Sequence, residues 1–310
     1  MSSQITEAFV KQFTSNVLHL SQQKGSRLRG AVRQETQKGV TAFYDRIGKA
    51  TALVRGSRHA DTPQIDTPHS RRAVTMADYE CADLIDNQDK IRLLINPESE
   101  YSQAFAWSLG RAMDDIILDQ ASGTAYSGET GGTAVTLPNG QKLASVASSA
   151  GAKLNVQALR RAKKILDGND VDPMIPRFCA HNANQLENLL SETETTSADF
   201  NTVRALVMGQ LDTFLGFKFI PTQQLNTQLT ALAFDQSTGA VATGSGAALN
   251  YEKVLCWAQD GIILSVGEDI KGRITERADK SYSMQVYASM SAGGVRMEEE
   301  KVVEILCLNT

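Results

Sequence analysis

One long amphipathic helix, predicted over residues 97–122, is the clearest pattern in this 310-residue chain. Asn96 can cap its start, Pro97 suits the first helical position, and Gly123 is a typical stop. At about 1.5 Å per residue the helix is a rod of about 36 Å, on which sheets can pack. Its apolar residues recur three and four positions apart. The residues expected to form its buried core face are Phe105, Leu109, Met113 and Ile116.

The first ninety residues contain little that could form a core of their own. A short amphipathic pattern over residues 5–23 includes Phe9 and Phe13 and leads into a glycine-containing stretch without a sustained period. Two strand-forming runs follow, at 50–56 and 71–85, separated by a proline-containing segment. A two-stranded hairpin cannot bury a core. We therefore expect both the arm and the hairpin to be ordered by other surfaces, those of neighbouring copies.

The remainder mixes helices with strands, predicts an α+β fold and contains no visible internal repeat. The glycine- and serine-rich residues 123–152 are expected to form a loop region with one short hairpin at 138–140. A buried strand within 174–182 is expected to enter the second of three helices, which are predicted at 155–168, 183–190 and 199–209. Later strands are predicted at 216–222, 229–235, 253–259, 261–267, 272–278, 281–292 and 295–308, the last two joined at Gly293-Gly294.

Charge is distributed unevenly, although the formal net charge is only −4. Between Lys11 and Arg72 there are 12 basic and 4 acidic residues, an excess of eight positive charges, so the rest of the chain carries −12. A basic region of this kind can bind nucleic acid, can contact the acidic remainder of another copy, or can simply be a solvated face. The stretch lacks the interleaved basic and aromatic residues that are typical of single-strand binding.

Composition and motif spacing disfavour several classes of protein. No apolar stretch approaches the ~20 residues that a membrane-spanning helix needs, and the first residues are too polar for a signal peptide. The four cysteines form no CxxC pair and the four histidines no HExxH pair. We therefore expect no membrane partner, no metal site, no cofactor and no disulfide, with thiols suited to a reducing cytoplasm.

No catalytic residue is predicted. The glycine clusters at 128–132 and 244–246 do not open a helix after a strand, as a phosphate-binding loop requires. The acidic residues of the long helix, Asp114, Asp115 and Asp119, are interpreted as a solvated face, and the run 298–300 as salt-bridging glutamates. A site assembled from distant residues stays open. The alternative function is therefore a cytoplasmic α/β enzyme, hydrolase-like, with such a site.

The order of these parts resembles the major capsid protein of tailed bacteriophages, with the Hong Kong ninety-seven-like fold, and looks closest to the capsid proteins of short-tailed phages. Three passages carry the resemblance: the hairpin return that runs into the long helix (74–120), a strand entry after a helix (214–225), and the closing strands (279–306). Gene-transfer-agent heads and encapsulin-type compartments share this fold, and the sequence separates them poorly.

The resemblance implies a division of the chain into an arm, a loop and two domains. The implied segments are an N-terminal arm at 1–49, an extended hairpin loop at 50–90, a peripheral domain at 91–172 with the spine helix 97–122, an axial domain at 173–267, and closing strands of the peripheral domain at 268–310.

It also implies a non-enzymatic protein that self-assembles, as hexamers and pentamers, into an icosahedral head shell around double-stranded phage DNA. The implied partners are further copies, a portal and a scaffolding protein, DNA bound without sequence specificity, and a decoration protein as a further candidate. The implied location is the virion capsid, after assembly in the bacterial host cytoplasm. The residues expected to contact neighbouring subunits are Phe9, Phe13, Arg27, Arg29, Arg33, Arg55, Arg58, Arg71 and Arg72.

Two optional features of the family are missing from the sequence. Some members weld their subunits through an isopeptide bond from a lysine in the extended loop, but no lysine occurs between Lys49 and Lys90. Some members carry a long helical segment before the arm that acts as a built-in scaffold, whereas here only the short pattern at 5–23 precedes it. We therefore expect no covalent weld and a separate scaffolding protein.

Overall fold

The computed structural model describes residues 21–59, 61–62, 64–86, 98–145, 153–191, 213–225, 227–234 and 241–308. The predicted helices at 5–23, with Phe9 and Phe13, and at 199–209 lie outside or almost outside the described residues. The chain divides into two compact units. The small unit comprises Met1–Ser26, Asp78–Ala112 and Glu268–Ser291, and the large unit comprises Arg27–Ala77, Met113–Gly267 and Ala292–Thr310. Helix α2 (Glu98–Ser122) contributes residues to both.

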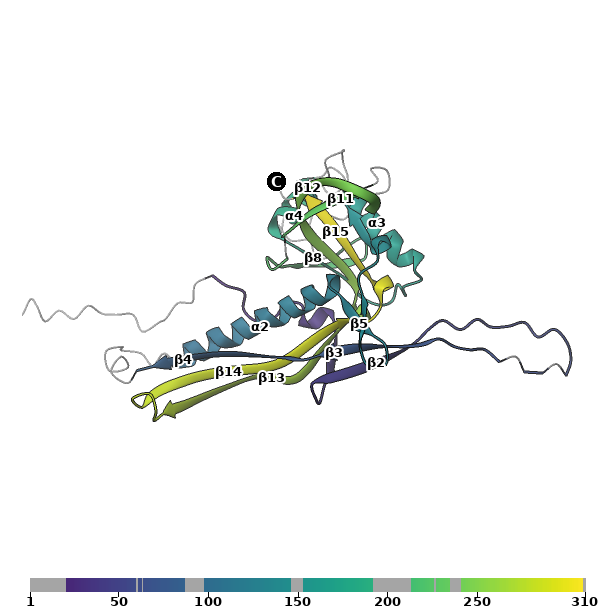
Figure 1. Ribbon diagram of the computed structural model, residues 1–310. Helices are drawn as coiled ribbons and strands as arrows, with labels where there is room; N and C mark the ends of the chain where they lie inside the picture. Colours follow the sequence, from purple (N-terminus) through teal and green to yellow (C-terminus); the bar gives the residue numbers. More distant parts are fainter. Residues whose placement is uncertain are drawn as a thin grey trace, which may run out of the picture. The chain divides into compact units, whose positions relative to one another are not determined.

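The small unit is built from the first half of α2 and from long strands. Strands β4 (Ala77–Ile85), β13 (Ile262–Arg277) and β14 (Ser283–Arg296) belong to a four-stranded sheet of order β1-β13-β14-β4. The helix lies along β4 and β14 (Figure 1), and Cys81 Sγ of β4 is 4.0 Å from Ser108 Oγ of α2. Polar side chains link the strands, since Tyr287 of β14 donates to Glu80 of β4 at 3.1 Å.

Helix α2 confirms the long amphipathic pattern and starts one residue after the predicted Pro97. Leu109, Met113 and Ile116 are buried, with 2%, 1% and 9% of their surface exposed. Phe105 was expected to be fully buried with them but is only half-buried. Its ring packs edge-on against that of Tyr101, with centroids 6.2 Å apart, and Tyr101 is itself exposed.

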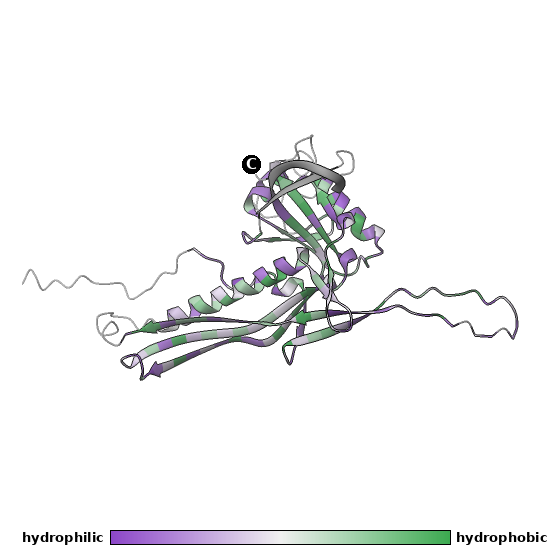
Figure 2. Cartoon of the chain, in the orientation of Figure 1, coloured by the Kyte–Doolittle hydropathy of each residue, from purple (hydrophilic) through white to green (hydrophobic). Residues whose placement is uncertain are grey.

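The large unit contains a seven-stranded sheet covered by two helices, α3 (Val156–Gly168) and α4 (Ala183–Ser191). Asn155 caps α3 as predicted, because its side chain accepts the N–H of Ala158 at 2.7 Å. Hydrophobic residues concentrate on the central strands of this sheet (Figure 2). The strand order is β7 (Lys142–Ala144), β15 (Val302–Leu308), β12 (Val241–Ala258), β8 (Arg177–His181), β10 (Phe217–Pro221) and β9 (Thr213–Phe214), with β11 (Thr227–Phe234) paired to β12.

The hydrophobic core of the large unit joins elements that the predicted domain boundaries separate. Helix α3 was assigned to the peripheral segment 91–172 and β15 to the closing strands 268–310, but both share one hydrophobic core with β8 and β12. Strand β15 pairs with β12 from Tyr251↔Leu308 to Trp257↔Val302 and is buried along almost its whole length. A strand buried on both faces needs cover from both sides, which α3 helps to supply.

Two breaks that were predicted between late strands are absent. The runs predicted as separate strands at 261–267 and 272–278 form one continuous β13. Gly293-Gly294 forms no turn, because β14 runs through both glycines to Arg296, and the break comes at a 3₁₀ turn, Glu299–Lys301. A Cβ on Gly293 would lie 2.6 Å from Thr75 O, so this glycine permits a close approach of two backbones.

The hairpin begins earlier in the chain than predicted. Strand β2 (Thr41–Ile47) pairs in antiparallel register with β3 (His69–Thr75), whereas the predicted strand at 50–56 has no strand structure. Strands β5 (Ala125–Ser127) and β6 (Thr133–Val135) complete a sheet of order β2-β3-β5-β6. The hairpin expected at 138–140 is instead a 3₁₀ turn, Asn139–Gln141.

Part of the predicted arm is buried within its own subunit. Leu28, Ala31 and Val32 are buried, and Trp257 Nε1 donates to Ala31 O at 2.9 Å. Strand β1 (Arg33–Thr36) then pairs in parallel with β13. The expectation that this stretch depends on neighbours for its burial is wrong for Leu28, Ala31 and Val32, which are buried within their own subunit.

Candidate assembly surfaces

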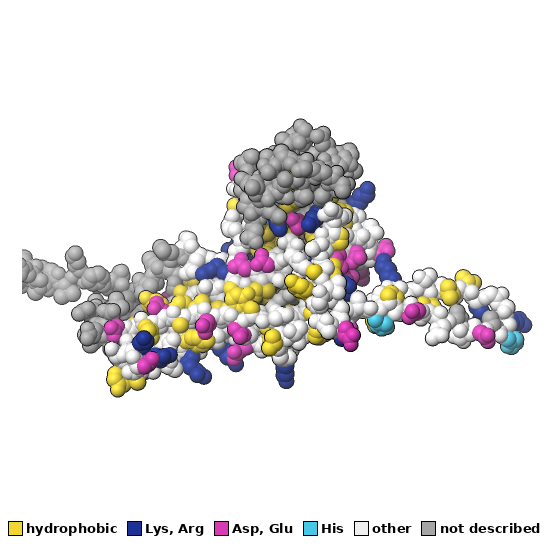
Figure 3. All heavy atoms as spheres, viewed as in Figure 1, with side chains coloured by type: hydrophobic (Ala, Val, Ile, Leu, Met, Phe, Trp, Pro, Cys, Tyr) yellow, Lys and Arg dark blue, Asp and Glu magenta, His cyan; other side chains and the backbone are white. Residues whose placement is uncertain are grey.

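The segment between β2 and β3, residues 48–68, contains no strand at its described positions, and nearly all of those positions are exposed to solvent. We call it the extended loop. It carries large apolar side chains without cover, since Val54 is 96% exposed, Leu53 58% and Ile65 42%. In the space-filling view, hydrophobic side chains occur among charged and histidine side chains along this segment (Figure 3). A row of exposed apolar residues on a projecting segment is typical of a surface that becomes buried on association.

The arginines predicted to contact neighbours fall into three groups. Arg55 and Arg58 lie on the extended loop and are exposed. Arg71 is 40% exposed, pairs with Asp45 across the hairpin at 3.1 Å, and lies over the ring of Phe43. These three remain accessible to another subunit.

The arm arginines have partners within their own chain. Arg27 Nη1 donates to Pro221 O at 2.8 Å, and Arg29 Nε donates to Gln34 Oε1 at 3.1 Å. Arg33 forms an ion pair with Glu35 at 2.6 Å, and 57% of its side chain is exposed. Partly exposed guanidinium groups of this kind can still donate to a further carboxylate from outside the subunit.

Arg72 was expected to contact a neighbouring subunit, and this expectation is wrong. Only 1% of its side chain is exposed, and its guanidinium pairs with Glu299. Strand alternation explains the error: Arg71 and Arg72 are adjacent on β3, so their side chains point to opposite faces, one to solvent and one into the subunit.

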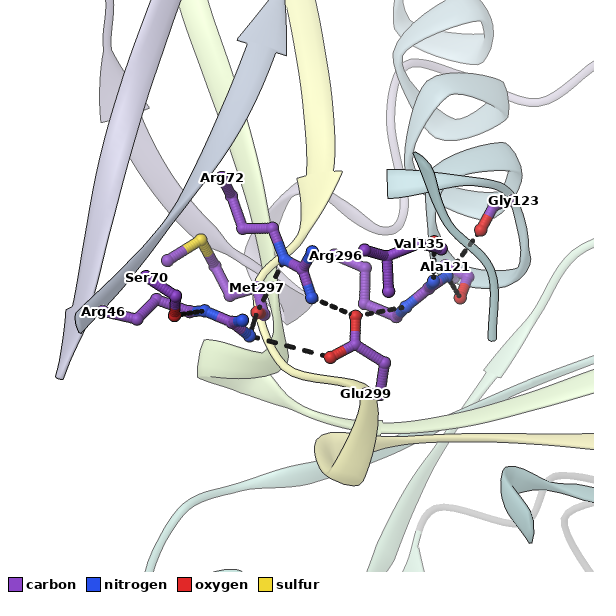
Figure 4. A network of polar contacts seen from close by, with 9 residues as sticks. All are labelled: Arg46, Ser70, Arg72, Ala121, Gly123, Val135, Arg296, Met297 and Glu299. Carbon is purple, nitrogen blue, oxygen red and sulfur yellow. Dashed lines mark hydrogen bonds and ion pairs between the residues drawn. The ribbon is translucent and has the colours of Figure 1, made fainter. Parts of the chain in front are cut away.

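Glu299 forms ion pairs with three arginines that come from distant parts of the sequence (Figure 4). Besides the contact with Arg72, its carboxylate lies 3.7 Å from Arg46 Nη1 of β2 and 3.8 Å from Arg296 Nε of β14. Burial lowers the pKa of Arg72 and of Arg296, and the Glu299 carboxylate opposes this by favouring their charged forms. The salt bridging predicted for the run 298–300 is thus present, but the run forms a turn rather than a strand.

Asp114 also departs from its predicted place on a solvated face. The side chains of Asp115 and Asp119 are exposed as expected, but that of Asp114 is fully buried. Its carboxylate accepts the backbone N–H groups of Arg27 at 2.9 Å and Leu28 at 3.1 Å. No local sequence signal separates Asp114 from Asp115, because the difference depends on where the arm lies.

Buried polar groups elsewhere in the large unit have structural partners. The carboxylate of Glu252 accepts bonds from Asn182 and from Gln185 Nε2, the latter at 2.7 Å, and Asn182 Oδ1 accepts the N–H of Gln185 at the start of α4. Among the described residues, no group of three or more histidine, cysteine or acidic side chains is placed to hold a metal ion. Within the same residues, no helix has the length and apolar character needed to cross a bilayer.

Comparison with known proteins gives a consistent picture. The family model described as "Phage capsid protein" matches residues 5–309. No curated protein matches the chain. Among solved structures, the capsid of Cyanophage P-SCSP1u is 18% identical with a TM-score of 0.73 and covers 100% of this chain and 96% of that one. Mycobacterium phage Che8 gives 17% identity, a TM-score of 0.66 and coverage of 96% and 97%. The capsid of a native GTA particle is 11% identical with a TM-score of 0.68, and the match covers 99% of this chain and 98% of that one. The fold is therefore the one that these capsid structures share.

Proposed function

Because the chain belongs to the phage capsid protein family and is a capsid shell protein, we propose that its copies assemble through the extended loop, residues 48–68, into the icosahedral head that encloses double-stranded phage DNA. The exposure of Leu53, Val54 and Ile65 on a segment without a core is the observation that carries this proposal. Burial of apolar surface contributes about 25 cal/mol per Å², so even a few such side chains, repeated at every contact of a lattice, stabilise a shell.

In this proposal each part of the subunit has a place in the shell. The seven-stranded sheet with α3 and α4 forms the axial domain, around which subunits meet as hexamers and pentamers. Helix α2, β4 and the outer parts of β13 and β14 form the peripheral domain. We assign α3 and β15 to the axial domain as well, because sharing one hydrophobic core with β8 and β12 supports their moving with it.

The subunit acts without catalysis and with few specific partners. We propose that it assembles in the bacterial host cytoplasm around a separate scaffolding protein, at a portal, and that the finished shell contacts DNA without sequence specificity. A decoration protein is a further candidate partner on the outer surface. The net positive charge between Lys11 and Arg72, with Arg55 and Arg58 exposed on the loop, suits contacts with the acidic remainder of another copy.

No covalent weld holds the shell in this account. A weld from the extended loop needs a lysine amine; its one lysine, Lys49, lies at the base of the loop and pairs with Asp170, and the strong bases between residues 50 and 89 are all arginines. Purified particles boiled in detergent with reductant are expected to give one band near 33.6 kDa. A ladder of multimers would show that a linkage of another kind exists.

A pair of apolar-to-acidic substitutions tests the contact role of the loop. The double variant Leu53→Asp/Val54→Asp alters only exposed side chains, so the subunit is expected to fold and to keep its melting temperature, yet to form no particles by negative-stain microscopy. Met174→Asp is the matched control, because Met174 is apolar and 87% exposed but lies after α3. Normal heads from the loop variant, at wild-type yield, would overturn the proposal that this loop is a contact element.

A further inference from the structure

We infer that Glu299 is a positioning residue that fixes the direction in which the β2–β3 hairpin, and with it the extended loop, leaves the large unit. The inference rests on the proposed function in one respect only, which is that the loop must reach a neighbouring copy. All residues concerned belong to the large unit.

Both strands of the hairpin are tied to the same short segment, residues 297–299. Arg46 of β2 and Arg72 of β3 lie two residues out of register on paired strands, since Arg46 is opposite Ser70. Each guanidinium donates to the Met297 carbonyl and faces the Glu299 carboxylate (Figure 4). Because two points on two strands are held, the hairpin can neither twist nor tilt there without breaking a charged contact.

The third arginine connects this contact to the end of the long helix. Arg296 Nη1 donates to Ala121 O at 3.1 Å and to Gly123 O at 2.7 Å, and Nη2 donates to Val135 O at 3.1 Å. The carbonyls of Ala121 and Gly123 lie at the negative end of α2, where a cation is favourable. Arg296 is completely buried, so Glu299 sits between a fixed point on the helix end and the base of the hairpin.

The hairpin base also borders an open cleft, whose lining includes Arg46 and the neighbours of Glu299, Glu298 and Glu300. A cleft of about 670 Å³ lies between residues 46–49 of the hairpin and the end of α3 at 168–172. An ion pair between Lys49 and Asp170, 3.0 Å long, spans this cleft, and the two side chains are 82% and 80% exposed. An exposed pair of this kind contributes little to rigidity. The hairpin therefore has room to move toward α3, and the contacts of Glu299 hold it back.

Among the described residues, Glu299 is the one carboxylate within 4 Å of all three guanidinium groups; Glu300 and Glu304 favour the charged forms of Arg72 and Arg296 only from farther away. Neutralising it leaves three cations close together, which repel each other in a poorly hydrated site. The expected relief is outward movement of Arg46, the most exposed of the three arginines at 22%, and the hairpin moves with it.

The direct test measures the hairpin in the unassembled full-length subunit. Spin labels at Val54→Cys on the loop and Met174→Cys on the body, in a Cys81→Ser background, report the distance between two exposed sites of the large unit. Glu299→Gln is expected to shift or broaden the distance distribution. Glu298→Gln is the matched control, since Glu298 is 42% exposed and pairs with Lys301 on the rim of the cleft. Identical distributions for wild type and Glu299→Gln would overturn the inference.

A second variant keeps the inference testable if Glu299→Gln fails to fold. An assembly assay then separates failure of the inference from failure of the proposed function. Arg72→Met/Glu299→Met replaces a buried ion pair by apolar groups of similar volume, which usually keeps a protein folded. It is expected to show the same displaced hairpin and to yield malformed or open shells. A displaced hairpin with normal heads would contradict the inference that direction matters. If the Leu53→Asp/Val54→Asp variant abolishes heads while both Glu299 variants keep the wild-type distances and heads, the inference fails and the proposed function stands.

Discussion

The buried carboxylate of Asp114 accepts a hydrogen bond from the backbone N–H of Leu28, 86 residues earlier in the chain. The neighbouring N–H of Arg27 donates to the same carboxylate. Leu28 is itself fully buried, so this contact fixes the point at which the arm joins the large unit. Helix α2 thus anchors the arm by a charged acceptor as well as by apolar packing.

Asp114→Ala is expected to lower the free energy of unfolding by about 3 kcal/mol, because it removes a carboxylate acceptor and leaves buried N–H groups without it. The control is Asp115→Ala, one residue away and exposed, which is expected to change stability by less than about 0.5 kcal/mol. Urea unfolding of the unassembled subunits measures both. Equal values for the two variants would mean that the arm contact contributes nothing.

Gly110→Ala is expected to release the arm from the first half of α2. Alanine in a helix is normally about 1 kcal/mol more favourable than glycine. Here, however, a Cβ would lie 2.7 Å from both Gly25 Cα and Ser26 N, which are backbone atoms that must move away. Trypsin is expected to cleave after Lys24 faster in this variant than in the wild type.

Gly168→Ala is the control for that experiment, since it ends helix α3 and no atom lies within 4 Å of its added Cβ. Its cleavage rate and melting temperature are expected to stay at wild-type values or to improve. An unchanged cleavage rate for Gly110→Ala would show that residues 21–26 are not held by the helix.

The elements found from sequence are those whose signals are local. The long helix, the Asn155 cap and strand β8 each depend on a few adjacent residues, and each appears within three residues of its predicted bounds. Strand β2 was missed because its alternation is mixed with charges, and its partner is 22 residues or more away. The burial of Arg72 depends on Glu299, 227 residues later in the chain, which no local pattern can reveal.

The sulfhydryl groups are expected to differ sharply in reactivity. The pKa of Cys179 is raised well above its ordinary value by its contact with Cys256 on the facing strand and by burial, and burial raises that of Cys307. A raised pKa and lack of access both suppress the reactive thiolate. Iodoacetamide is expected to modify only Cys81 in the native unassembled subunit and all four cysteines in denaturant, as read by mass spectrometry. Native labelling of a second cysteine would contradict the packing of the sheet.

Acidification is expected to weaken the large unit through His181. Burial against Phe219 lowers the pKa of its imidazole below the ordinary 6.5, although the carbonyl of Asn182 opposes this. The unfolded chain therefore binds the proton more readily than the folded one, so stability is full above about pH 6.5 and falls as the pH drops below it. The melting temperature of the wild type is expected to fall between pH 7 and pH 5.5. In His181→Phe the melting temperature is expected to change less over this pH range. An equally large fall in the variant would assign the acid sensitivity to another group.

The central claim is that copies of this chain build a shell in which the extended loop of one subunit lies on its neighbour. Cryo-electron microscopy of particles formed by the full chain measures this most directly. The account predicts closed shells in which Leu53, Val54 and Ile65 are covered by an adjacent copy. A small discrete oligomer, or a shell in which residues 48–68 face solvent, would contradict it.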